Sequence, residues 1–457
     1  TMYKMGLLNG NRTKSANIVG QTMKLNPHGD AAIYETMVRL TRGNEALLMP
    51  FVDSKGNFGK VYSRDMAYAA PRYTEAKLDA FCAELFRDID TDAVDFVDNY
   101  DGEMKEPTLL PTTFPNILVS ANTGIAVGMA SNFCGFNLEE VCRTTIECIR
   151  NTEHDILSTM PAPDFTTGGE LIYDESEMRA IYESGRGSFK VRAKWAYNKK
   201  DNLIEITEIP YTMIGAGINK CLSDIADLVE SKKLADVVDI SNQSNKEGIR
   251  IVLELKKDAD IEKIQNILYK KTKLEDTFGV NMLAITNGRP ETLNLKGILK
   301  NYLDFQYKNN TRKYQVLLEK ELEKKEIKEG LIKACDVIDL IIAILRGSKN
   351  LKDAKACLME GDISRINFRV PGFEEDAKQL HFTEKQATAI LEMRLYKLIG
   401  LEILALEKEY RETLRKIKEY QHILKNRDTM NQVIMEDLDA IKEEFAMIRM
   451  TDIEDGK

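Results

Sequence analysis

A tyrosine directly after an arginine is the first feature of the sequence that could do chemistry. Arg72 and Tyr73 stand together in YAAPRYTEAKL, just after Pro71. A free phenol has a pKa of about 10 and is a poor nucleophile at neutral pH, but a neighbouring cation stabilises the phenolate and the charge on an attacked phosphate. The pair could therefore be a nucleophile with its electrostatic partner. The alternative is an ordinary half-buried tyrosine near a helix start, and spacing alone favours this alternative.

A histidine before a predicted helix is the second candidate. His28 lies between Pro27 and Gly29 in KLNPHGDAAIYE. Free backbone N–H groups and the helix dipole favour an anion at a helix N-terminus, so His28 could contact a phosphate. It could equally be a turn residue that supports the helix cap, and the residues alone leave both interpretations open.

Nucleotide and metal sites are not predicted. The glycine-rich stretch NTGIAVGMASN lacks the Gly-Lys-Ser/Thr ending of a phosphate-binding loop, and the spacing of Gly124 and Gly128 is not a dinucleotide fingerprint. No three or four carboxylates stand at metal-ligand spacing, and the acidic stretch VDFVDNYDGE is interpreted as a solvated turn. Any use of ATP would therefore belong to a partner, and no metal ligand is assigned.

Composition and charge favour a cytoplasmic, multidomain protein with one basic end. The chain has 457 residues, and none of its apolar runs approaches the roughly 18 residues of a membrane span. Its seven cysteines form no C-x-x-C pair, which is typical of a reducing compartment. Residues 1–80 hold 11 Lys/Arg against 7 Asp/Glu, whereas the remainder holds 53 against 66. The N-terminal region is thus the part expected to meet phosphates.

The elements that would position these residues begin with two helices and a loop. Apolar spacing predicts a helix in GDAAIYETMVRLTR with Asp30 as its N-cap. A second helix is predicted over residues 71–89, with Pro71 in its first turn and Lys77 one turn beyond Arg72 on the same face. The glycine-bearing stretch 52–62 between them is predicted to be a loop.

The rest of the chain predicts an α+β region followed by long helices. Alternating residues indicate strands at 188–197, 202–211 and 248–258, the first two joined as a hairpin, and a helix at 218–233. Two charged helices, 301–334 and 401–427, flank about 70 compact helical residues. This pattern predicts an antiparallel coiled-coil arm that carries a head. The apolar seam of the second helix runs through Ile403, Leu406, Tyr410, Thr413, Ile417, Tyr420 and Leu424.

Several motifs together resemble one family. In the same order along nearly the whole chain, they are similar to the A subunit of bacterial type IIA DNA topoisomerases, the family of DNA gyrase and topoisomerase IV. The motifs are NPHGDAAIYETMVRL, VDSKGNFGKV, AAPRYTEAKL, VDFVDNYDGEMKEPTLLPTTFPNILVSANTGIAVGMASN, ITEIPY and TFGVNMLAITNGRPETLNLKGIL.

The resemblance implies a multidomain α+β fold. Residues 1–110 would form a winged-helix catalytic domain, truncated at its N-terminus because the family's R-D-G-L-K-P run is not found. Residues 111–290 would form the family's tower domain, and 291–457 a coiled-coil arm with a helical dimer gate at 335–400. The β-pinwheel that follows the arm in the family is not found either.

The resemblance also implies the chemistry. Tyr73 would attack a DNA phosphate, form a 5′-phosphotyrosyl link and free a 3′-hydroxyl, with Arg72 as its neighbouring cation and His28 as a transition-state and DNA contact. Two copies in a homodimer would cut opposite strands so that a second duplex can pass. A non-enzymatic DNA-organising coiled-coil protein is the alternative, but such a protein would not need the Arg72–Tyr73 pair, His28 or an apolar wedge at Ile125.

Further positions follow from the same resemblance. Ile125 would wedge between base steps and bend the DNA. Lys14 and Lys24 would contact DNA, and so would Asn26, which stands where the family has the first histidine of H-P-H-G-D.

Cofactors and partners are implied as well. Mg²⁺ and ATP would be supplied by a B subunit in an A2B2 complex on DNA, in the cytoplasm at the nucleoid. This chain itself would bind neither cofactor and no membrane.

Two departures bear on drugs and on the type of enzyme. In the family a serine commonly follows G-D, and this serine helps to anchor quinolones together with an acidic residue. In this chain Ala31 replaces the serine, and Glu35 is the acidic residue. We therefore expect weaker quinolone action. These residues do not decide between gyrase and topoisomerase IV, although the altered motifs KLNPH and APRY favour a topoisomerase IV-like paralogue.

Overall fold

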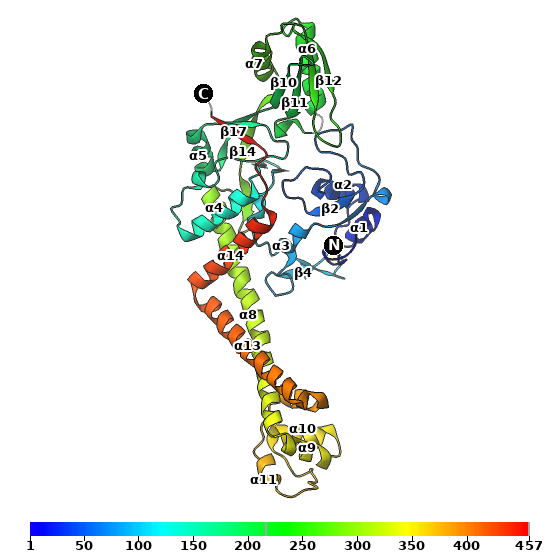
Figure 1. The fold of residues 1–457 in the computed structure, drawn as a ribbon, viewed down its shortest axis with the longest axis vertical. Helices are drawn as coiled ribbons and strands as arrows, with labels where there is room; N and C mark the ends of the chain where they lie inside the picture. Colours follow the sequence, from blue (N-terminus) through cyan, green and yellow to red (C-terminus); the bar gives the residue numbers. More distant parts are fainter. Residues whose placement is uncertain (215–216, 456–457) are drawn as a thin grey trace. The chain divides into compact units, whose positions relative to one another are not determined.

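The computed structural model describes residues 1–214 and 217–455, which form two compact units (Figure 1). Unit 1 comprises residues 1–90, 94–308 and 431–457, and unit 2 comprises 91–93 and 309–430. Within the described residues, none of the helices combines the length and the apolarity that a membrane crossing requires.

The N-terminal part of unit 1 packs two helices on a small antiparallel sheet. Its strands lie in the order β1 (Thr13–Lys14), β3 (Glu75–Leu78), β2 (Val52–Lys55), and its helices are α1 (Ser15–Thr22) and α2 (Asp30–Leu40). The helix predicted in residues 29–42 is confirmed, but Gly29 rather than Asp30 is its N-cap. A shared core joins helices and sheet, and it includes Ile18, Val19, Ile33, Tyr34, Met37, Val38, Val52, Phe58 and Ala76.

The predicted helix at 71–89 is wrong. The chain forms a 3-10 turn, η1 (Pro71–Tyr73), then strand β3, a second 3-10 turn (Ala80–Cys82) and the short helix α3 (Ala83–Phe86). Ala76 and Leu78 are buried and alternate with half-exposed Glu75 and Lys77, which is a strand pattern. Because β3 pairs with β1 and β2 together, tertiary pairing overrides local helix propensity.

Two further corrections follow in this region. Lys77 does not share a helical face with Arg72, because it lies on β3, where its Nζ is 3.9 Å from Asp53. The predicted loop 52–62 contains strand β2 in its first four residues.

A six-stranded sheet forms the centre of unit 1. Its order is β17-β8-β9-β14-β7-β6, so the C-terminal strand β17 lies at one edge and the β6–β7 hairpin at the other. Helices α4 (Leu138–Arg150) and α5 (Glu175–Ser184) pack with it around a core that includes Phe136, Phe165, Phe189 and Phe278. The strands are β6 (Asn122–Ala126), β7 (Met129–Phe133), β8 (Glu170–Tyr173), β9 (Arg186–Arg192), β14 (Glu275–Asn281) and β17 (Asp452–Asp455).

A second sheet in unit 1 has four strands in the order β10-β11-β13-β12. The predicted hairpin and the strand at 248–258 are confirmed here as β10–β11 and β13. The predicted strand 188–197 is two strands, β9 and β10, which belong to different sheets. The bounds are β10 (Lys194–Asn198), β11 (Leu203–Glu208), β12 (Val237–Asn242), β13 (Ile251–Leu255), α6 (Gly217–Glu230) and α7 (Ile261–Lys271).

Two small hairpins and most of one helix also belong to unit 1. The hairpins are β4–β5 (Phe96–Asp98 and Lys105–Pro107) and β15–β16 (Leu283–Thr286 and Arg289–Thr292), and the helix is α14 (Arg427–Phe445), which falls almost entirely in this unit.

Unit 2 contains the predicted pair of long helices. Most of α8 (Leu295–Asp336) lies in this unit and runs antiparallel to α13 (Gly400–Lys425). Tyr314 packs on Tyr420 with ring centroids 5.6 Å apart, and further along the Tyr410 hydroxyl donates to Glu329 at 2.6 Å. The chain that joins α8 to α13 forms a helical head, which is built on α9 (Ile338–Gly347), α10 (Leu351–Glu360), α11 (Glu374–Ala377) and α12 (Glu384–Leu391). The small core of the head includes Ile341, Ile344, Cys357, Leu358 and Phe382.

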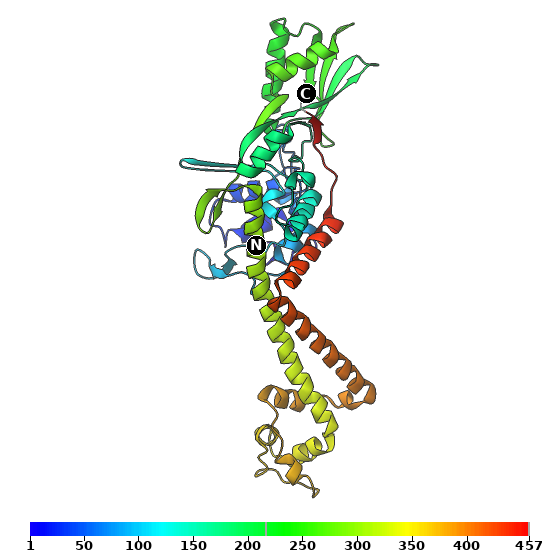
Figure 2. The same ribbon diagram turned by 90° about the vertical axis from the view of Figure 1, so that its left-hand side faces the viewer.

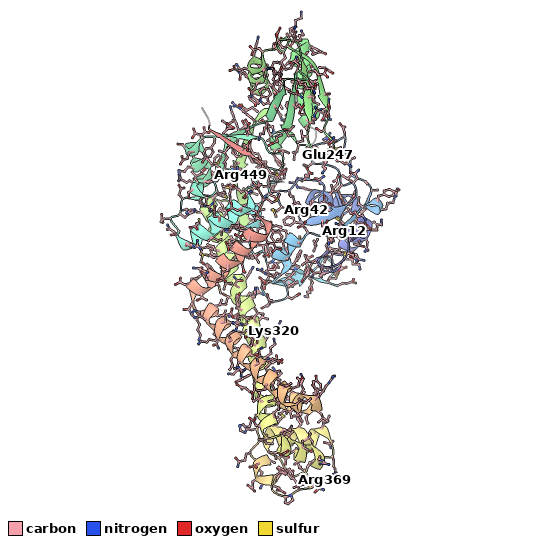
Figure 3. All side chains as sticks on the ribbon, viewed as in Figure 1. Arg12, Arg42, Glu247, Lys320, Arg369 and Arg449 are labelled. Atoms are coloured by element: carbon pink, nitrogen blue, oxygen red, sulfur yellow. The ribbon has the colours of Figure 1, made fainter. Side chains whose placement is uncertain are left out.

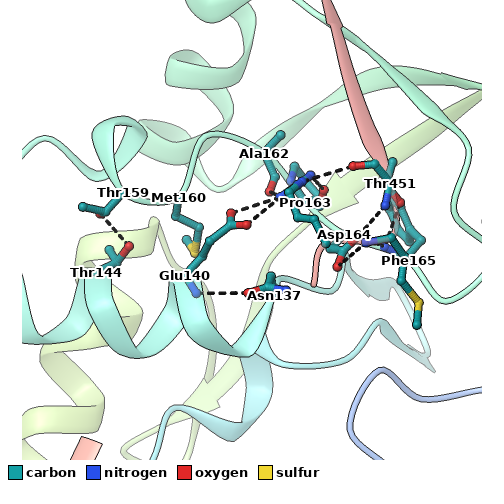
Figure 4. Close-up of polar contacts among 12 residues, drawn as sticks. Asn137, Glu140, Thr144, Thr159, Met160, Ala162, Pro163, Asp164, Phe165 and Thr451 are labelled. Atoms are coloured by element: carbon teal, nitrogen blue, oxygen red, sulfur yellow. Dashed lines mark hydrogen bonds and ion pairs between the residues drawn. The ribbon is translucent and has the colours of Figure 1, made fainter. Parts of the chain in front are cut away.

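The segment after α14 is held to the centre of unit 1 by buried polar groups. The Arg449 guanidinium lies 3.0 Å and 3.1 Å from the two oxygens of Glu140 and donates to the carbonyls of Ala162 and Pro163. The Asp164 carboxylate accepts from the backbone N–H of Thr451 at 2.8 Å (Figure 4). Strand β17 then pairs in parallel with β8. The segment is therefore part of the core of unit 1.

Candidate active site

The predicted nucleophile lies on a short, stiff turn. Pro71 fixes the first residue of η1, and the Tyr73 N–H donates to the carbonyl of Ala70 at 2.9 Å. Tyr73 is 64% exposed, whereas the next residue, Thr74, is fully buried. Gly56, at φ +108°, lets the loop after β2 approach Thr74 closely, since a Cβ there would lie 3.3 Å from Thr74 Cγ2. The turn thus presents a solvent-exposed phenol from an anchored backbone.

One cation contacts this phenol ring, and a second lies on the neighbouring strand β1. The Arg72 guanidinium carbon is 4.8 Å from the centroid of the Tyr73 ring, within cation–π range. Lys14 is the cross-strand partner of Glu75, which follows Tyr73 by two residues in the sequence. The Lys14 Nζ is 4.0 Å from Glu75, a loose pair that leaves the ammonium exposed. The positive charge of these two side chains favours an approaching phosphate.

Nearby arginines are less available to a ligand. Arg12 pairs with Asp53 at 2.9 Å and Arg42 with Asp79 at 2.7 Å, and both arginines are labelled in Figure 3. In the part of the chain that the structure describes, Arg72 and Lys24 form no ion pair. A cation without an ion pair can exchange its water for a phosphate.

The loop between α1 and α2 presents the other predicted DNA contacts. Lys24, Asn26 and His28 are all exposed. The Asn26 side chain accepts the backbone N–H of His28 at 3.3 Å, which shapes the approach to the N-terminus of α2. Among the described residues, no hydrogen bond or ion pair joins His28 to Tyr73.

The loop is held from behind by a residue that the sequence did not single out. Asn99, on the β4–β5 hairpin, is 6% exposed and donates from Nδ2 to the carbonyl of Lys24 at 3.0 Å. Its Oδ1 accepts from the backbone N–H of Met104 at 3.1 Å. The stretch predicted as a solvated turn is thus a hairpin with a buried asparagine that supports the loop of His28.

The two positions compared with quinolone contacts lie on the exposed side of α2. Ala31 follows the first residue of the helix, and Glu35 lies one turn later. Glu35 accepts from the Tyr68 hydroxyl at 3.4 Å. Burial, together with the negative charge of Glu35, raises the pKa of Tyr68. Both side chains remain open to solvent.

Ile125 lies on a separate projection. It stands near the tip of the β6–β7 hairpin, which extends away from the body of unit 1 (Figure 2). Ile125 is 92% exposed and Val127, in the turn, is fully exposed. Two fully solvated aliphatic side chains at a hairpin tip bury no apolar surface in the chain itself, so they are candidates for contact with a ligand.

The described residues offer no cluster of three or more His, Cys, Asp or Glu that could hold a metal ion. No metal ligand is assigned among the side chains around Tyr73.

The geometry of an exposed tyrosine beside cations on a helix-and-sheet scaffold agrees with the family comparison. The family model for the A subunit of DNA gyrase/topoisomerase IV matches residues 1–439. The chain belongs to this family.

Particular relatives give the scale of the similarity. The chain is 42% identical to the DNA gyrase A subunit of Clostridium acetobutylicum over 463 residues, covering 99% of the chain and 53% of that protein. It is 40% identical to the DNA gyrase A subunits of Staphylococcus epidermidis and Staphylococcus aureus over 451 residues, which is 97% of the chain and 48% of each relative. The chain thus spans about half the length of the curated relatives it matches.

Proposed function

We propose that this chain carries the DNA breakage–reunion activity of a type IIA topoisomerase A subunit. The observation that carries the proposal is Tyr73, exposed on an anchored turn with the Arg72 guanidinium against its ring, in a member of this family. Its chemistry would serve double-strand passage in relaxation, decatenation or supercoiling.

The proposed reaction exchanges one phosphodiester for another. The phenolic oxygen of Tyr73 gives up its proton and attacks the phosphorus of one DNA phosphodiester. A new O–P bond joins Tyr73 to the 5′ phosphate, the bond to the 3′ oxygen breaks, and that oxygen takes up a proton to become a 3′-hydroxyl. Attack by the 3′-hydroxyl reverses each step, so resealing consumes no ATP at this centre. Arg72 stabilises the phenolate and the charge on phosphorus.

The remaining predicted residues would bind and shape the DNA. Lys14, Lys24 and Asn26 would contact the backbone, and His28 would contact the reacting phosphate from the N-terminus of α2, where the helix dipole favours an anion. Ile125 would insert between base steps, at a cost of a few kcal/mol that contacts along the bent duplex offset.

The domain roles are part of the proposal. Residues 1–110 would act as the winged-helix catalytic domain, 111–290 as the tower, and 291–457 as the coiled-coil arm with a dimer gate at 335–400. Exposed apolar side chains in unit 2 support pairing with a second copy, because they have no burial within their own unit: Leu395 is 83% exposed and Leu401 is 78% exposed.

Partners and cofactors complete the proposal. Two copies would assemble with two B subunits on DNA at the bacterial nucleoid, in the cytoplasm, and the B subunit would supply Mg²⁺ and the ATPase. Whether the complex behaves as a gyrase or as topoisomerase IV would be decided by pairing the full-length protein with its B subunit and testing for negative supercoiling of relaxed DNA.

A strand-passage assay tests the proposed function. The wild-type protein with B subunit, Mg²⁺ and ATP should relax or decatenate DNA, whereas Tyr73→Phe should bind DNA equally well but pass no strand. Tyr68→Phe is a matched control, because it also removes an exposed hydroxyl near α2. Strand passage by Tyr73→Phe would overturn the proposal. A wild-type protein that binds and compacts DNA without breaking it would instead favour the DNA-organising alternative.

A further inference from the structure

Three buried hydroxyl groups lie in a row behind η1 (Pro71–Tyr73), the nucleophile turn. The Tyr34 hydroxyl lies 2.9 Å from Thr74 Oγ1, and Thr74 Oγ1 lies 2.7 Å from Ser15 Oγ. Tyr34 also donates to the carbonyl of Ala69 at 2.8 Å. Ser15 and Thr74 are fully buried and Tyr34 is 4% exposed, so these groups exchange their hydrogen bonds with each other and not with water.

The row reaches both ends of the segment that carries Tyr73. Ala69 comes before Ala70 and η1, and Thr74 comes directly after Tyr73. One hydroxyl, that of Tyr34, therefore bonds to the residues on each side of the segment Ala70–Tyr73. The Ser15 N–H adds a bond of 2.9 Å to the carbonyl of Thr74.

The contacts inside the turn do not fix its orientation. Pro71 and the bond from the Tyr73 N–H to the carbonyl of Ala70 shape the turn locally. Tyr34, in contrast, belongs to α2, and Ser15 is the first residue of α1. The row is thus a polar connection between the turn and the two helices that flank the loop of His28.

We infer that Tyr34, Thr74 and Ser15 are positioning residues that fix the position of the nucleophile turn relative to α1 and α2. This inference rests on the proposed function, since the role of the row would be to orient Tyr73 toward a phosphate bound near α2. None of the three hydroxyls touches DNA in this account, because all three are buried.

The Tyr34 hydroxyl keeps the proton that such a role needs. Burial raises the pKa of Tyr34, while the hydrogen bond to Thr74 opposes that shift. The Tyr34 phenol therefore stays protonated at neutral pH and keeps its hydrogen for the carbonyl of Ala69. Removal of any one hydroxyl leaves a buried partner unsatisfied, and the turn is then free to shift.

The test compares variants that differ in a single hydroxyl. Tyr34→Phe and Thr74→Val each interrupt the row, whereas Thr74→Ser keeps the hydroxyl. Tyr182→Phe is the control for general stability, because Tyr182 is 5% exposed and donates to the carbonyl of Met160 at 2.9 Å in a different core.

The measurement separates binding from chemistry. Each variant is combined with B subunit and Mg²⁺, the affinity for a labelled duplex is measured, and the rate of covalent-complex formation is then followed at saturating DNA. Because a small misplacement of a reacting group can cost about a hundredfold in rate, we expect Tyr34→Phe and Thr74→Val to slow this step about ten- to a hundredfold. Affinity should change less than about twofold, which at saturating DNA is too small to mimic a slower step.

Rescue decides between positioning and simple destabilisation. Thr74→Ser and Tyr182→Phe should form the covalent complex at the wild-type rate. Wild-type rates for Tyr34→Phe and Thr74→Val, or equal slowing by Thr74→Ser and Thr74→Val, would overturn the inference and leave the proposed function standing. A wild-type complex that traps no covalent DNA would overturn both.

Discussion

Removal of Arg449 should loosen the C-terminal segment from the centre of unit 1. Arg449 is the cation that faces Glu140, which lies on α4 with only 11% of its side chain exposed. The Arg449 side chain is itself 19% exposed and also donates to the carbonyls of Ala162 and Pro163. Arg449→Met keeps much of the side-chain length but leaves the Glu140 carboxylate buried without its cation.

The expected magnitude follows from this burial. Loss of one partner from a buried ion pair costs about 3–5 kcal/mol, and the partial exposure of Arg449 places the effect near the lower limit, about 3 kcal/mol. Glu140→Gln in the same chain removes the stranded charge and should recover a large part of the loss. The double variant is therefore expected to be more stable than Arg449→Met alone.

Hydrogen exchange is the appropriate assay, because the two units need not unfold together. A loss of about 3 kcal/mol should speed exchange of protected amides in β17 by about a hundredfold, if they exchange through opening of this segment. The Asp452 N–H, which donates to the carbonyl of Gly169 at 2.9 Å, is a suitable reporter. Unchanged protection, or no recovery on addition of Glu140→Gln, would refute this account of the segment.

The effect should also depend on pH. Burial raises the pKa of Glu140, and Arg449 acts against that shift. Without Arg449 the pKa should rise further, so the folded state would bind a proton more tightly than the unfolded state does. Such a group favours the folded state increasingly as pH falls, and the defect of Arg449→Met should be full at neutral pH and shrink in mildly acidic buffer. A defect of constant size would contradict this explanation.

Two further predictions concern DNA and drugs. Ile125→Ala should leave the thermal unfolding temperature unchanged, because the side chain is 92% exposed. The same variant should reduce DNA bending, measured by energy transfer between labelled duplex ends. Equal bending by wild type and variant would exclude the wedge. Ala31→Ser should increase quinolone-stabilised cleavage in the complex with the B subunit, because it restores the family's hydroxyl at the start of α2, and ordinary drug sensitivity of the wild type would contradict the reasoning.

Elements with strong periodicity were predicted well from the sequence. Three such elements are the helix at Asp30–Leu40, the hairpin β10–β11 and the antiparallel pair α8 and α13. Their apolar residues recur at the spacing of a helix or a strand, and this spacing can be read from neighbouring residues in the sequence. Strand β3 was missed because its four residues are too few to show a clear alternation. Its pairing partners lie about 20 to 26 residues away in β2 and about 60 away in β1.

The candidate site divides in the same way. The residues themselves pointed to Arg72, Tyr73 and His28. The resemblance pointed to Lys14 and Ile125, because motif order carries that information. The sequence could not point to Tyr34 or Asn99, since their roles arise from hydrogen bonds to residues distant in the chain. A tyrosine on the apolar face of a helix is, from sequence alone, an ordinary core residue.

The identity of the covalently linked residue tests the central claim most directly. The wild-type protein, combined with B subunit and Mg²⁺ on DNA, is denatured to trap the cleaved complex, then digested with nuclease and trypsin. Cleavage after Arg72 and Lys77 would release the peptide YTEAK, residues 73–77. We predict that mass spectrometry will find a 5′-linked nucleotide on Tyr73 of this peptide. A nucleotide on any other residue, or cleaved DNA with no protein attached, would contradict the account.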